Sequence, residues 1–228
     1  MEQFLDIMLE LAEGFGNTIL LFVVTLLFAL PLGLLLAFGS MSKFKPLKWL
    51  VKVLVWIVRG TPLMLQILLV SFLPQYVFQV PTKQLAAALN ISINATMFLF
   101  VALAFILNYA CYFSEIYRAG IEAIPIGQYE AGQVLGLTKN QIFSKIVLMQ
   151  VIRRILPPMS NEIITLVKDT SLARVLGVVD LLNAARHAVN PYVILSPFIY
   201  ATVFYLIFNG ALTLLLSWLE KKLSYYKV

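Results

Sequence analysis

The 228-residue chain contains 61% hydrophobic and only 12% charged residues, and its mean hydropathy is +0.90. Soluble domains carry about 25% charged residues, so this composition excludes an ordinary soluble domain and indicates a membrane protein. The net charge of +6 does not indicate nucleic-acid binding, because the lysines and arginines lie in short clusters between apolar runs, as in cytoplasmic loops. No repeat or linker divides the chain, which predicts a single all-α transmembrane domain over residues 1–228.

The N-terminal segment is acidic, and no basic residue precedes Lys43. This pattern is the opposite of a cleavable signal peptide, so we expect no processing. The first apolar run, 18–38, is uncharged and long enough to cross a hydrocarbon core of about 30 Å. Pro31 and Gly33 are expected to kink it. Four lysines follow directly, so the first span is predicted to end in the cytoplasm and to leave the N-terminus outside: Lys43, Lys45, Lys48 and Lys52.

The second apolar run, 49–72, is predicted to return outward. Arg59 lies in its middle and is followed by Gly60, Thr61 and Pro62, and we expect the proline to open the helix beside the arginine. Residues 74–90 are predicted to form an external connection. The third run, 91–112, then returns to the cytoplasm.

A polar stretch, 112–150, follows the third run and is predicted to lie in the cytoplasm. Gly127 and Gly136 bracket a short helical pattern, and Thr138 with Gln141 predicts a capping box that starts a second helix. On that helix the apolar side chains should share one face outside the bilayer, where such a surface usually contacts a partner: Ile142, Phe143 and Ile146.

A fourth span over 159–176 is predicted from parity, because the segment is too polar to be found by hydropathy. The chain is inside at Arg154 and must be inside again at Lys221, after the clear apolar run 198–219. A single run cannot begin and end on the same side. Five spans result, with 177–190 outside and the C-terminus cytoplasmic, and most of the 17 basic residues then lie inside.

Charged side chains within spans cost about 2.5 to 3.5 kcal/mol at mid-bilayer, so they should face protein or water. Glu162, Thr165 and Asp169 recur on one helical face and predict a polar pathway. Arg59 is suited to a carboxylate and an acidic side chain to an ammonium, as in a zwitterion. The alternative interpretation is that these charges pair with one another, or that Arg59 caps carbonyl groups, only to hold the bundle together.

Enzymatic motifs are not found. The sequence has no G-x-x-x-x-G-K-[ST] loop, no G-x-S-x-G and no metal-ligand spacing. His187, the only histidine, falls in an external segment, and the lone Cys111 excludes an intrachain disulfide. We therefore expect no catalysis, cofactor or metal on this chain.

Three stretches together resemble the permeases of ABC importers, in the polar amino-acid branch that includes histidine, glutamine and arginine systems. They are VRGTPLMLQ (58–66), SEIYRAGIEAIPIGQYEA (114–131) and NEIITLVKDTSL (161–172). The general E-A-A permease signature matches Glu130, Ala131 and Gly136 in spacing. It departs at Gly132, which replaces an alanine, and at Met149, which replaces a proline.

The resemblance implies a type I ABC importer fold in the bacterial cytoplasmic membrane. A coupling helix within 119–150 would dock on a separate ATPase subunit dimer, which binds ATP and Mg, through Tyr129, Glu130, Ala131, Gly132 and Gly136. A second permease chain, identical or related, and an extracytoplasmic binding protein would complete the importer. The implied substrate pathway comprises Arg59, Thr61, Pro62, Gln66, Glu162, Thr165, Lys168, Asp169 and Ser171.

The main alternative is a secondary transporter or channel driven by an ion gradient, in which Glu162, Lys168 and Asp169 act as a relay. The sequence leaves the particular amino acid open. It also leaves open whether the permease pairs with itself or with a paralogue, and which of the two carries the substrate site.

Overall fold

The structure is a computed structural model that describes residues 2–189 and 195–223, and over these residues it is helical. The predicted external position of Asn190 and the cytoplasmic position of Lys227 lie outside the described residues. In chain order the helices are α1 (Glu2–Ser40), α2 (Lys45–Arg59), α3 (Leu63–Phe78), α4 (Thr82–Ala88), α5 (Ile93–Glu122), α6 (Ile126–Val134), α7 (Lys139–Ile142), α8 (Leu148–Asp169), α9 (Leu181–Val189) and α10 (Ser196–Leu223). A π-helical turn, η1 (Phe143–Val147), joins α7 to α8, and a 3-10 helix, η2 (Thr170–Leu176), follows α8.

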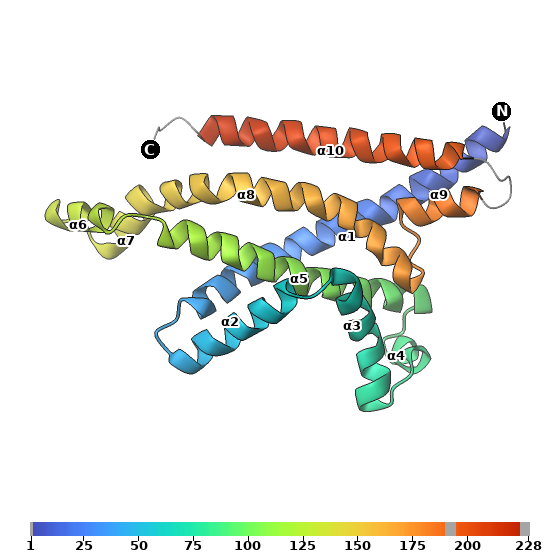
Figure 1. Ribbon diagram of the computed structural model, residues 1–228, viewed down its shortest axis with the longest axis horizontal. Helices are drawn as coiled ribbons and strands as arrows, with labels where there is room; N and C mark the ends of the chain where they lie inside the picture. The colour runs from blue at the N-terminus through green and yellow to red at the C-terminus, as the bar shows by residue number, and fades with distance from the viewer. Residues whose placement is uncertain (1, 190–194, 224–228) are drawn as a thin grey trace.

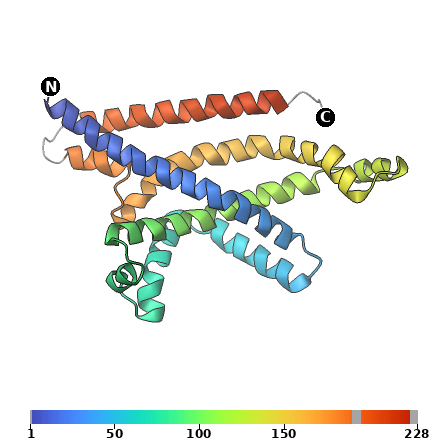
Figure 2. The same ribbon diagram turned by 180° about the vertical axis from the view of Figure 1, so that it is seen from behind.

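The molecule is elongated, and its connections collect at two ends (Figures 1 and 2). The connection between α1 and α2, helices α6 and α7, and the end of α10 lie toward one end. We call this the basic end, because Lys43, Lys45 and Lys221 belong to these segments. The start of α1, α4 and α9 lie toward the opposite end. The long helices therefore run between two ends of different composition.

The core forms where α1 and α5 cross. Leu21, Phe105 and Phe113 are almost fully buried there. A Cβ atom at Gly33 would lie 2.9 Å from both the Ala110 carbonyl oxygen and the Phe113 Cβ, so glycine is what lets the two backbones approach. Helix α1 continues through Pro31 and Gly33 as one element to Ser40.

Three helices are long and apolar enough to cross a membrane: α1, α5 and α10, within the described part of the chain. Helices α2 and α3 qualify only as a pair, and they are bent by 111° at the break between them. The run 49–72 is therefore not one continuous helix. Pro62 explains the break, because it has no N–H to donate and restricts the preceding residue to extended conformations.

The structure changes the bounds of two predicted elements. Residues 74–90, predicted as an external connection, include the end of α3, which continues through Pro74 to Phe78, and helix α4. The polar fourth element begins at Leu148 rather than at Met159, and α8 ends at Asp169, where the tighter η2 continues to Leu176. Helix α8 includes Arg153 and Arg154 and does not qualify as an apolar span within the described residues.

Candidate functional site: a charged cavity and an exposed helix

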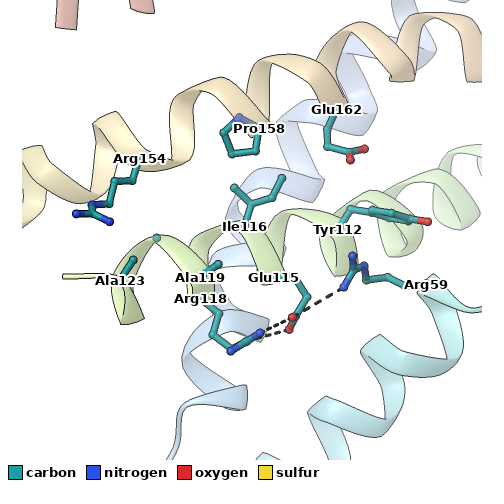
Figure 3. A pocket seen from close by; sticks show the side chains of 11 residues that line it. Arg59, Tyr112, Glu115, Ile116, Arg118, Ala119, Ala123, Arg154, Pro158 and Glu162 are labelled. Atoms are coloured by element: carbon teal, nitrogen blue, oxygen red, sulfur yellow. Dashed lines mark hydrogen bonds and ion pairs between the residues drawn. The ribbon is translucent and has the colours of Figure 1, made fainter. Parts of the chain in front are cut away.

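A cavity of about 570 Å³ lies between the end of α2, the second half of α5 and the middle of α8. Figure 3 shows charged side chains from all three helices around it. Its lining includes three guanidinium groups and two carboxylates, which come from Arg59, Arg118, Arg154, Glu115 and Glu162. The cavity therefore combines both signs of charge between three helices.

Arg59 reaches this cavity from the last residue of α2. Its guanidinium lies over the Tyr112 ring, 5.1 Å from the ring centroid. Its Nη1 atom is 3.9 Å from Glu115 Oε2, and 42% of the side chain is exposed. The contact with Glu115 is long, so Arg59 is only loosely paired and its side chain stays partly accessible.

Glu115 and Arg118 form the tightest ion pair at the site, and the sequence interpretation missed it. Arg118 Nε donates to Glu115 Oε1 at 3.1 Å and Nη2 donates to Oε2 at 2.6 Å. Arg118 Nη1 also donates to Glu122 Oε2 at 2.6 Å. The spacings of three and four residues along one helix were the available signal, since such residues are neighbours on its surface.

Glu162 extends from α8 into the cavity, across from Arg59 and Tyr112 (Figure 3). The other predicted residues of α8 and η2 do not line this cavity. Asp169 accepts a hydrogen bond from the buried Tyr109 hydroxyl at 2.7 Å, Lys168 is exposed, Ser171 donates to the Lys168 carbonyl and Thr165 is half-buried. Only Arg59 and Glu162 among the predicted pathway residues meet at the cavity.

Thr61, Pro62 and Gln66 belong to the break between α2 and α3. Pro62 is the residue before α3 begins, and the Thr61 hydroxyl donates to the Ile57 carbonyl at 2.9 Å. Gln66 Nε2 donates to the carbonyl oxygens of Val58 and Thr61. These side chains stabilise the bend that presents Arg59 to the cavity.

Helix α6 lies at the basic end, beside α7 (Figure 1). Glu130 and Ala131 are exposed, and so are the apolar side chains of Val134 (88%) and Leu135 (74%). Gly136 ends this segment with φ +73, a conformation that favours glycine. The helix therefore offers a mixed charged and apolar surface away from the long apolar helices.

The inner face of α6 packs against the segment that follows. Gly132 is buried, and a Cβ there would lie 2.6 Å from Ile142 Cγ1. Tyr129 packs at the edge of the same small core, which contains Ile142 and Val147. Glycine in place of alanine at position 132 therefore gives a close approach of α6 to α7.

The predicted capping box is confirmed. Gln141 N donates to Thr138 Oγ1 at 3.4 Å, and Thr138 N donates to Gln141 Oε1 at 2.9 Å. The expected shared face is only partly formed, because Ile142 is buried whereas Phe143 is 46% exposed. The π turn from Phe143 shifts the helical register, and α8 then continues through Met149.

No group of three or more His, Cys, Asp or Glu side chains could hold a metal ion within residues 2–189 and 195–223. The chemistry that the cavity offers is binding by charge and hydrogen bonding. The fold and this cavity define a helical membrane protein with a charged cavity between three of its helices.

Comparison with known proteins gives the family. A family model described as "Binding-protein-dependent transport system inner membrane component" matches residues 29–225. The L-cystine transport system permease protein TcyB of Bacillus subtilis is 35% identical over 218 residues, which cover 95% of this chain and 87% of that protein. The arginine transport system permease protein ArtQ of Bacillus subtilis is 36% identical over 215 residues, covering 93% and 91%.

Solved structures agree with this assignment. A crystal structure of an amino acid ABC transporter with histidines matches with a TM-score of 0.79 at 27% identity and covers 96% of each chain. An inward-facing structure of the MetNI methionine ABC transporter matches with a TM-score of 0.63 over 95% of each chain, and at 17% identity it shows the shared fold alone.

The chain is thus a multi-pass inner-membrane transport component. It belongs to the permease family of binding-protein-dependent ABC transporters, in the polar amino-acid branch. The resemblance predicted from the three motifs is confirmed, and the chain is the non-catalytic permease component rather than an ion-driven carrier.

Proposed function

We propose that this chain forms the translocation pathway of an importer for a polar amino acid and receives the energy of ATP hydrolysis through α6. A separate ATPase subunit dimer docks on that helix, a second permease chain pairs with this one, and an extracytoplasmic binding protein delivers the substrate. The relatives named for cystine and arginine support the substrate class.

The exposure of α6 is the observation that carries the coupling role. Glu130 and Ala131 lie on a surface helix next to exposed Val134 and Leu135, and their match to the E-A-A spacing supports a coupling role for this helix. A charged residue with apolar neighbours suits a groove on a soluble partner. From α6 the chain continues through α7 and η1 directly into α8, so movement of α6 is passed to the helix that carries Glu162.

The cavity supports a zwitterionic substrate. The fork of Arg59 is suited to an α-carboxylate, and the Glu162 carboxylate on the other wall is suited to an α-ammonium group. Both groups belong to every amino acid, so this pair selects the class rather than one member.

The five-span topology remains part of the proposal. Helices α1, α5 and α10 with the α2–α3 pair give four crossings, and α8 supplies the polar fifth. The collection of lysine-rich segments at the end that also carries α6 supports a cytoplasmic basic end and an external N-terminus.

The coupling role is tested with the complex reconstituted in liposomes with its ATPase and binding protein. Glu130→Arg should leave assembly and ATP hydrolysis measurable while substrate uptake per ATP falls at least tenfold, because the docking surface gains the wrong charge. Asn140→Arg, on the exposed surface of α7, is the matched control and should transport normally. Normal uptake by Glu130→Arg would contradict the proposal.

A further inference from the structure

Two helices that border the cavity are interrupted, and both interruptions are tied to the same point of α5. The first lies between α2 and α3, at Gly60–Pro62. The second lies where α8 ends at Asp169 and η2 begins. Their partners on α5 are the adjacent residues Asn108 and Tyr109, which are 5% and 2% exposed.

The first interruption is held through Gln66. Its Nε2 donates to Val58 O (2.7 Å), Thr61 O (3.0 Å) and Thr61 Oγ1 (2.9 Å), so one amide bridges the end of α2 and the start of α3. The Oε1 of the same amide accepts a hydrogen bond from Asn108 Nδ2 at 2.9 Å. The hydrogen bond between Gln66 and Asn108 therefore ties the bend that places Arg59 to α5.

The second interruption is held through Tyr109. Its hydroxyl donates to Asp169 Oδ2 at 2.7 Å, at the last residue of α8. Neighbouring positions on a helix point about 100° apart, which lets Asn108 and Tyr109 reach two different elements from one turn. Helices α3 and η2 also contact each other beyond the two interruptions. The four elements thus meet at one turn of α5.

We propose that Asn108 and Tyr109 are positioning residues that link the two interruptions, so that a displacement of α8 is transmitted to the α2–α3 bend and to Arg59. The inference rests on the proposed function, in which α6 drives α8. A displacement of Asp169 moves Tyr109 through their hydrogen bond. The adjacent Asn108 transmits this displacement to Gln66 and to the bend. Because both α5 side chains are buried, a lost hydrogen bond leaves its partner unsatisfied and loosens the link.

The link is tested by disturbing it at α8 and measuring at α3. Met64→Cys places a thiol in the first turn of α3, where the side chain is 45% exposed, while the native Cys111 is buried and does not compete. In the complete complex, the rate of maleimide labelling at this position should change several-fold when a non-hydrolysable ATP analogue binds. Tyr109→Phe should abolish that change because the proposed link to α8 is the hydrogen bond of the Tyr109 hydroxyl to Asp169, and Gln66→Leu should abolish it as well.

Matched controls lie on the same helices. Tyr117→Phe removes a hydroxyl from α5 that makes no hydrogen bond to α8 in the described part of the chain, and Gln75→Leu alters an exposed amide of α3. Both should keep the nucleotide-dependent change. Uptake by Tyr109→Phe and Gln66→Leu should fall about tenfold, and the double variant should fall no further, because the residues act as one unit.

The outcomes separate the two proposals. The link is overturned if the nucleotide-dependent change in labelling persists in Tyr109→Phe. It is also overturned if that change is missing from the parent complex, which carries Met64→Cys alone. If one of these variants fails to assemble, Asn108→Ser is used in its place, because it shortens the side chain that donates to Gln66 without adding bulk. A parent complex that labels as expected but transports no amino acid overturns the proposed function and leaves the link standing.

Discussion

Arg59 Nη1 lies 3.9 Å from Glu115 Oε2, and the same carboxylate is held at 2.6 Å by Arg118. Glu115 is therefore committed to Arg118, and its contact with Arg59 is the weaker of the two. The ring of Tyr112 adds a second support beneath the Arg59 guanidinium. Arg59 is thus oriented toward the cavity without being neutralised, which is what a binding group for a carboxylate needs.

Replacing Arg59 should therefore affect substrate handling more than assembly. Arg59→Ala is expected to raise the KM for uptake by at least tenfold, because a charge-assisted hydrogen bond contributes about 1.5 to 3 kcal/mol. Arg59→Lys should be intermediate, since it keeps the charge but not the two-pronged geometry. Initial uptake rates in proteoliposomes measure this.

Lys48→Ala, on the same helix at the basic end, is the control for Arg59 and should leave KM unchanged. If Arg59→Ala instead reduces the yield of assembled complex as much as it reduces uptake, the residue serves to hold the bundle together.

Replacing each of two glycines of α6 by alanine should change the stability of the protein in opposite directions. At Gly132 the new Cβ would meet Ile142 at 2.6 Å, whereas at Gly127 nothing lies within 4 Å. Gly132→Ala should therefore lower stability by about 1 to 3 kcal/mol through overpacking. Gly127→Ala should raise it by about 0.4 to 1 kcal/mol, because alanine lowers the conformational entropy of the unfolded chain. Thermal unfolding in detergent distinguishes the two, and equal shifts would contradict the close α6–α7 packing.

The sequence predicted the features that depend on neighbouring residues. The Thr138–Gln141 capping box needs only a spacing of three residues, and the break at Pro62 follows from a missing N–H group. The family motifs predicted the permease class. These signals are local or are carried by short motifs, so no knowledge of the packing was required.

The geometry of the site could not be predicted in the same way. The 111° bend and the contact of Arg59 with Glu115 depend on how α2 and α3 pack on α5. Gln66 was predicted to line the pathway, and only tertiary structure reveals its bonds to Thr61 and Asn108. The burial of Asp180 likewise depends on α1 and α9, which lie far apart in the sequence.

Asp180 lies at the opposite end, just before α9, and is 1% exposed. Its carboxylate accepts hydrogen bonds from the backbone N–H groups of Leu182 (3.0 Å) and Asn183 (3.2 Å). Thr18 Oγ1 accepts the N–H of Leu181, which ties the same turn to α1. Burial raises the pKa of Asp180 to about 6 from its usual 3.8, despite these hydrogen bonds and the nearby Arg174, which lower it.

The raised pKa predicts that the folded protein loses stability as the pH rises. The folded state holds the Asp180 proton more tightly than the unfolded state does. The stabilisation that this gives the folded state is fully present below about pH 3.8 and is lost as the pH rises through about 6. The difference between the two pKa values corresponds to about 3 kcal/mol of folding free energy.

Thermal unfolding of the complex in detergent at pH 5 and pH 8 should show a lower midpoint at pH 8. Asp180→Asn keeps an acceptor oxygen without the charge and should flatten this dependence. Asp6→Asn, which neutralises an exposed carboxylate of α1 at the same end, should leave it in place. An unchanged pH dependence in Asp180→Asn would show that another group is responsible.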